Sequence, residues 1–181
     1  MGSRRGAIDR STSLAAALAG VLMVGACAGA NGTDEMDIKD TQQAAAEFLP
    51  RVESAIAPLA IDRESFEVRT NRCEGAQGET RDDLYYIWVG LRGVARGNDI
   101  AAQIEAAHAR WQADGWDITR FRKLDNGGVS LTATDPATGD TYTLDSGFQP
   151  APDAYVVGFF NTPCLQAPEA KVAFGKLDVR R

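Results

Sequence analysis

The sequence predicts an α+β fold, a two-layer domain in which an antiparallel meander sheet of about five to six strands carries two helices on one face. Two amphipathic helical patterns and a series of short strand patterns lead to this prediction. The segments 125–128 and 135–140, between the later strand patterns, are rich in Gly, Asn, Asp and Pro. Such residues form the tight turns between antiparallel strands, so these strands are expected to follow one another as a meander.

The first helical pattern begins at Asp40 or Thr41, and either residue is a suitable N-terminal cap. Pro50 lies inside the pattern and has no amide N–H, so it is expected to kink the helix or divide it into two short helices. The apolar residues recur at the spacing of one helical face: Ala45, Phe48, Leu49, Val52 and Ile56.

The second helical pattern begins at Asn98 or Asp99, and Gly115 is placed to end it. The only histidine of the chain, His108, borders the apolar face of this helix, where a structural role is expected for it. That face is predicted to consist of Ile100, Ile104, Ala107 and Trp111.

Strand patterns are rich in β-branched and aromatic residues and occur at 66–70, 84–91, 116–123, 129–134, 141–146 and 155–160. The segment 84–91 (LYYIWVGL) is apolar almost throughout, which predicts a central position in the sheet. The last residues of the chain, 166–181, alternate only weakly and are expected to form an edge strand or a loose tail.

The central strand predicts a possible binding surface. Because successive side chains of a strand point to opposite faces, Tyr86 and Trp88 share one face. If the helices cover only one face of the sheet, one set of side chains on this strand stays partly exposed. Tyr86 and Trp88 are therefore candidate binding residues. The alternative set, on the other face, is Tyr85, Ile87, Val89 and Leu91.

The N-terminus has the pattern of a bacterial lipoprotein signal. Residues 1–13 are polar and contain three arginines, and residues 14–24 are an uncharged apolar run that is too short to span a bilayer. The sequence Val-Gly-Ala-Cys at 24–27 follows and resembles the lipobox, in which the cysteine receives the lipid. We expect a signal peptide at 1–26, lipid on Cys27, a flexible tether at 27–40 and one domain at 41–165. A plain signal peptide with a chance cysteine is the alternative.

The net charge of the chain limits the partners that it is expected to bind. The chain has 181 residues and a net charge of −6, and the part after residue 26 keeps 16 basic and 24 acidic residues. An acidic domain repels phosphate backbones, so a nucleic-acid partner is not expected.

If Cys27 carries lipid, Cys73 and Cys164 remain as a pair outside the cytoplasm, where a structural disulfide is expected. Free thiols or a redox pair are the alternative.

The sequence predicts no catalytic site, no metal site and no cofactor. A serine-hydrolase elbow of the form G-x-S-x-G does not occur, and phosphate-binding or dinucleotide-binding glycine motifs are also absent. A zinc site needs three or four ligands. With one histidine and two cysteines expected to be oxidised, the chain offers no convincing set.

The order of these parts resembles small lipoproteins of actinobacteria and, more distantly, the LppA-like lipoproteins. The likeness covers about residues 41–165 and is carried by Cys73, the segment 106–116 (AAHARWQADGW) and Thr162-Pro163-Cys164. It implies the same fold and the same disulfide, and it implies no activity.

The function expected from these observations is that of a lipoprotein anchored at the extracytoplasmic face of the cell membrane by lipid on Cys27. Its domain is expected to be a non-enzymatic module that binds a ligand or an envelope protein, or supports an envelope assembly. The alternatives are a cell-wall or lipid hydrolase that uses two carboxylates, and a carrier of a small apolar ligand.

Overall fold

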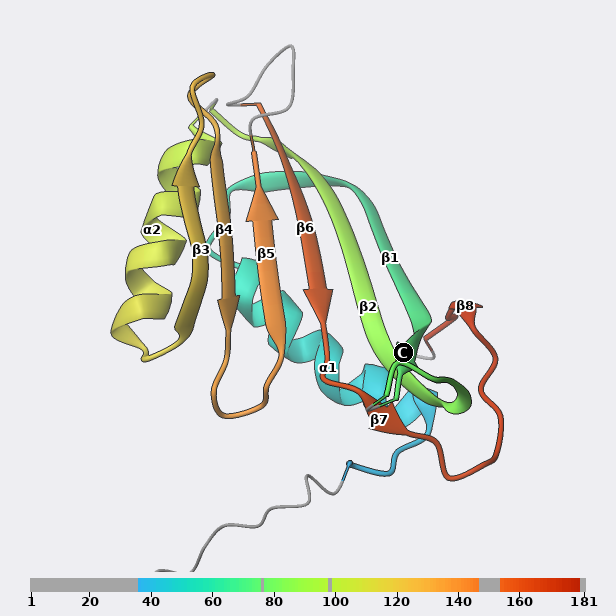
Figure 1. Cartoon of the computed structure of the whole chain (residues 1–181). Coiled ribbons are helices and arrows are strands. Elements are labelled where there is room, and N and C mark those ends of the chain that lie inside the picture. Colours follow the sequence, from blue (N-terminus) through green and yellow to red (C-terminus); the bar gives the residue numbers. More distant parts are fainter. Residues whose placement is uncertain (1–35, 76, 98, 147–153, 180–181) are drawn as a thin grey trace, which may run out of the picture. The chain divides into compact units, whose positions relative to one another are not determined.

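The computed structural model describes residues 36–75, 77–97, 99–146 and 154–179 (Figure 1). The predicted signal peptide, Cys27 and the tether up to residue 35 lie outside the described residues. The described part of the chain forms two helices and an antiparallel sheet, which confirms the α+β class. None of its helices combines the length and the apolar character needed to cross a membrane.

Helix α1 spans Thr41–Ile56 and helix α2 spans Ile100–Ala113. The carboxylate of Asp40 caps α1 by accepting a hydrogen bond of 2.9 Å from the amide of Gln43. Pro50 lies inside α1 but does not divide it, contrary to one of the two expectations. Pro50 has no amide N–H to donate to the carbonyl group four residues before it. Because Pro50 is exposed, water can donate a hydrogen bond to that carbonyl group instead.

Within the described residues the sheet has eight strands, so the predicted number of five to six is wrong. In space the strands follow the order β3-β4-β5-β6-β2-β1-β8, and β7 pairs separately with β2. All of the strand pairings are antiparallel, and β2 is central, as its apolar sequence predicted. The strands are β1 (Ile61–Glu74), β2 (Thr80–Ala95), β3 (Asp117–Lys123), β4 (Val129–Thr134), β5 (Thr141–Asp145), β6 (Tyr155–Asn161), β7 (Leu165–Gln166) and β8 (Gly175–Lys176).

The two additional strands, β7 and β8, have two residues each, which is too short for an alternating pattern to be recognised in the sequence. They lie in the C-terminal segment, where β8 pairs with β1 at the edge of the sheet. Strands β1 and β2 also extend well beyond the segments predicted for them, because they form one long hairpin whose polar ends do not alternate.

Both helices pack into one apolar cluster on a single face of the sheet. In Figure 1, α2 runs beside β3 and β4, and α1 crosses behind the middle strands. The four residues predicted for the buried face of α2 are all buried. On β2 the inward residues of the cluster are Tyr85, Ile87, Val89 and Leu91. The opposite side, which carries Tyr86 and Trp88, is called the outer face below.

Candidate ligand-binding groove

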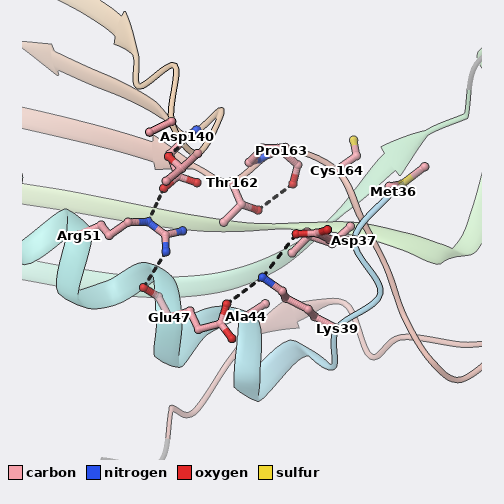
Figure 2. Close-up of a pocket in the computed structure, with 13 residues that line it drawn as sticks. Met36, Asp37, Lys39, Ala44, Glu47, Arg51, Asp140, Thr162, Pro163 and Cys164 are labelled. Carbon is pink, nitrogen blue, oxygen red and sulfur yellow. Dashed lines mark hydrogen bonds and ion pairs between the residues drawn. The ribbon is translucent and has the colours of Figure 1, made fainter. Parts of the chain in front are cut away.

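A half-open groove of about 600 Å³ lies along α1. Its walls come from four parts of the chain: the segment before α1, the first turns of α1, the β4–β5 turn and the segment that follows β6 (Figure 2). Five of the side chains that line it are charged: Asp37, Lys39, Glu47, Arg51 and Asp140. Figure 2 shows that these residues form a row of contacts in which acidic and basic residues alternate.

One end of the row is the pair of Arg51 and Asp140. Nε of Arg51 donates to Oδ2 of Asp140 over 2.6 Å, and the Asp140 side chain is only 1% exposed. The hydroxyl of Tyr142 donates to the same oxygen over 3.4 Å. No described residue donates a hydrogen bond to the other oxygen, Oδ1, which is also buried. Oδ1 of Asp140, a residue that lines this end of the groove, is therefore a buried acceptor with no partner among the described residues.

The other end of the row is more exposed. Nζ of Lys39 lies 2.8 Å from Oε2 of Glu47 and 3.5 Å from Oδ2 of Asp37. The hydrogen bond from Lys39 lowers the pKa of Glu47, and the same bond raises the pKa of Lys39. Both groups are therefore charged over the whole physiological range of pH.

Local sequence explains how α1 contributes to this row. Glu47 and Arg51 are four residues apart, so both project from the same side of the helix. Nη1 of Arg51 also donates to the backbone carbonyl of Glu47 over 3.0 Å, which fixes the direction of the guanidinium.

The β4–β5 turn holds Asp140 through its own hydrogen bonds. The carboxylate of Asp135 accepts from the amide of Ala137 over 2.9 Å and from the hydroxyl of Thr138 over 3.2 Å. The amide of Asp140 in turn donates to the Thr138 hydroxyl over 3.3 Å. These hydrogen bonds within the turn involve Asp and Thr, which favour local bonds to the backbone. They hold Asp140 in its position in the wall of the groove.

A disulfide stands beside the groove. Cys73 and Cys164 are bonded, with their Cα atoms 6.0 Å apart and a separation of 91 positions in the sequence. This confirms the predicted pair. Cys164 and Pro163 line the groove directly, whereas Cys73 is buried at the end of β1. The disulfide therefore fixes the segment after β6 to the β1–β2 hairpin.

A second groove, of about 530 Å³, lies on the other side of Arg51 between the two helices and the β4–β5 turn. Three aromatic residues, Trp111, Trp116 and Tyr142, form part of its wall. The Trp111 and Trp116 rings are stacked with their centroids 4.9 Å apart, and the Trp116 and Tyr142 rings are 4.8 Å apart. Because Arg51 lines both grooves, its side chain separates them.

The residues proposed from sequence as a binding surface lie elsewhere. Tyr86 and Trp88 are half-buried on the outer face, and the side-chain amide of Asn71 donates to the Tyr86 hydroxyl over 3.3 Å. Neither residue lines either of the two grooves described above. His108 stacks on Phe121, with ring centroids 3.9 Å apart, and so joins α2 to β3. Cys27, the predicted lipid site, lies outside the described residues.

Among the described residues no group of three or more His, Cys, Asp or Glu side chains is placed to hold a metal ion. The groove residues Arg51 and Asp140 were not identified from sequence. The sequence of 135–140 predicts a hairpin turn, and turn carboxylates are usually exposed. No sequence signal reveals that this one is buried against a helix that begins almost 100 residues earlier.

Comparison of the chain with protein-family models, with curated proteins and with solved structures finds no match.

Proposed function

We propose that this chain is a lipid-anchored module of the cell envelope that binds a small polar ligand in the groove along α1 and performs no catalysis. The observation that carries the proposal is Asp140, a buried carboxylate in a groove large enough for a small molecule, with one oxygen that no described residue uses. Buried acceptors are nearly always hydrogen-bonded in folded proteins, so such an oxygen marks a position where a ligand donor is favoured.

The charges around Asp140 favour a neutral donor. Arg51 already balances the Asp140 carboxylate, and an ammonium group at Oδ1 would be placed close to the guanidinium of Arg51. A hydroxyl or amide N–H group meets no such repulsion. Oδ1 of Asp140 is buried, so a ligand donor would bond to it after a displacement of the residues that line this end of the groove.

The alternative of a hydrolase with two carboxylates has less support. A general acid needs a raised pKa so that it stays protonated at neutral pH. In the groove, however, the hydrogen bond from Lys39 lowers the pKa of Glu47. The alternative of an apolar-ligand carrier is favoured by one observation, the aromatic wall of the second groove formed by Trp111, Trp116 and Tyr142.

The ligand can be sought by native mass spectrometry of the full chain purified from its own membrane. We expect a bound species of a few hundred daltons that is lost in Ala137→Trp, because Ala137 is exposed and lines the groove without contributing to the charged row. Ala102→Trp, on the exposed side of α2, is the matched control and should keep the ligand. A species retained by both variants would place the ligand elsewhere, and an empty wild-type protein would contradict the proposal.

Anchorage has a separate test. Processed wild-type protein should partition into the detergent phase, and Cys27→Ala should remain in the aqueous phase or stay unprocessed. Partitioning that does not change in Cys27→Ala would refute the lipid anchor.

A further inference from the structure

The outer face of the sheet carries an aromatic platform, formed by Trp88 on β2 and Phe159 on β6. A Cβ atom added to Gly90 would lie only 2.1 Å from Cη2 of Trp88. The indole therefore lies along the strand, flat over Gly90, where a side chain at that position would displace it. Phe159 pairs with Gly90 on the neighbouring strand. The centroids of the Phe159 and Trp88 rings are 6.1 Å apart, and the angle between the two ring planes is 31°.

Hydroxyl groups border this platform on the side of β5 and β4. Phe159 pairs with Thr143, and Thr143 pairs with Thr132, so the three side chains form one row across the outer face. The two threonine hydroxyls are 3.2 Å apart, and Nη2 of Arg120 lies 3.0 Å from the Thr132 hydroxyl. A hydroxyl has one donor and two acceptor positions, so these groups keep capacity for a ligand.

The charges of the outer face balance one another beside the platform. Arg92 pairs with Glu64 over 2.8 Å, and Arg69 lies 3.6 Å from Glu67. The charged side chains next to the platform on β1 and β2 are thus paired with one another.

The exposed apolar area is also small. Within the described part of the chain, Phe159 and Ile38 are the exposed large hydrophobic residues, and Phe159 is 40% exposed. A stable interface between two protein copies needs about 800 Å² from each partner around an apolar centre. One pair of rings, tilted by 31° to each other, is too small for such an interface. It suits a ligand that has an apolar face and a polar rim.

We propose that the outer face binds a neutral polysaccharide. The C–H face of a pyranose ring would stack on Phe159 and Trp88, and the sugar hydroxyls would bond to Thr143, Thr132 and their neighbours. This site is separate from the groove along α1, and it would let a membrane-anchored module hold a glycan of the envelope.

The test is isothermal titration of the full chain with cellohexaose and with chitohexaose, in a detergent that has no sugar headgroup. We expect at least one hexasaccharide to bind and Phe159→Ala to weaken it by about tenfold. Ile38→Ala, which removes the other exposed apolar side chain, is the matched control and should leave the affinity unchanged. The groove variant Ala137→Trp should also bind normally, so this proposal and the proposed function fail independently.

Gly90→Ala tests the orientation of the platform while both rings remain. We expect the added methyl group to push the Trp88 indole off the sheet and to weaken glycan binding by about the same factor. Near-ultraviolet circular dichroism of each variant confirms that it is folded. Three results would overturn the proposal: no binding of either hexasaccharide, binding that Phe159→Ala leaves unchanged, or a dimer in sedimentation experiments that Phe159→Ala dissociates.

Discussion

Arg51 and Asp140 are 89 residues apart in the sequence, and Nε of the first donates to Oδ2 of the second over 2.6 Å. The pair connects α1 to the β4–β5 turn. The two partners differ in exposure, since the Arg51 side chain is 35% exposed and that of Asp140 is 1% exposed. The stability of the charged Asp140 in its buried position therefore depends on Arg51.

Arg51→Ala is expected to lower the free energy of unfolding by about 2–4 kcal/mol, because it leaves a buried charge without its partner. Arg96→Ala is the matched control. Arg96 pairs with Asp62 over 2.8 Å, but both side chains are more than 60% exposed, so the control should cost less than about 1 kcal/mol. Urea denaturation at neutral pH measures both values. Equal losses in the two variants would show that burial does not strengthen the Arg51–Asp140 pair.

The Cys73–Cys164 disulfide is expected to contribute on the order of 4–5 kcal/mol, because it closes a loop of 91 residues in the unfolded chain. The double variant Cys73→Ser/Cys164→Ser should unfold at a lower urea concentration by a corresponding amount. Reduced wild-type protein should match it, whereas oxidised wild-type protein should not. Alkylation of two cysteines in unreduced native protein, detected by mass spectrometry, would contradict the disulfide itself.

Sequence reasoning succeeded where the signal was local. The buried face of α2 follows from the spacing of Ile100, Ile104, Ala107 and Trp111. The N-terminal cap of α1, Asp40, is one of the two residues that the sequence predicted for it, the other being Thr41. The disulfide followed from the number of cysteines left after one is assigned to the lipid. Each of these inferences needs only a few neighbouring residues or a count.

Strands β7 and β8 and the groove could not be predicted, because they depend on contacts between segments that are distant in the sequence. Strands β7 and β8 are strands only because β2 and β1 offer free edges to them, and two residues carry no periodic signal. The groove arises in the same way. A turn sequence such as 135–140 predicts a reversal of the chain, but whether Asp140 meets solvent or Arg51 is decided by the packing of α1.

Asp145 is expected to make stability depend on pH. Burial raises the pKa of its carboxyl group above 3.8, although Arg120 partly opposes the effect. The folded protein therefore holds this proton at pH values where the unfolded chain has lost it. Stability falls as the pH rises from 3.8 through the folded-state pKa, and the penalty then persists at neutral pH.

Asp145→Asn removes this penalty. The variant should be more stable than wild type at pH 7, and the difference should shrink as the pH falls towards 3.8. Urea denaturation at several pH values measures it. Asp125→Asn, in the exposed β3–β4 turn, controls for the general benefit of removing one negative charge from an acidic protein. If the difference in unfolding free energy between Asp145→Asn and wild type stayed constant with pH, the raised pKa of Asp145 would be contradicted.

The β4–β5 turn reaches the groove only because residue 139 is a glycine. Gly139 has a φ of +73°, and a Cβ atom there would lie 2.9 Å from Cγ of Pro163. Gly127, in the neighbouring hairpin turn, has a φ of +85° and nothing within 4 Å of the added atom. Alanine at either position carries a backbone cost of about 1–2 kcal/mol, but only Gly139→Ala also pushes the turn away from Pro163.

Gly139→Ala should therefore lower the free energy of unfolding more than Gly127→Ala does, as measured by urea denaturation. It should also loosen the groove, because the displaced turn carries Thr138 and Asp140 with it. Hydrogen exchange should then accelerate at the amides of Gly139 and Asp140, which bond to Asp135 and Thr138, and stay unchanged within α2. Equal destabilisation by the two alanines, with exchange in the turn unaltered, would mean that contact with Pro163 does not hold the turn in place.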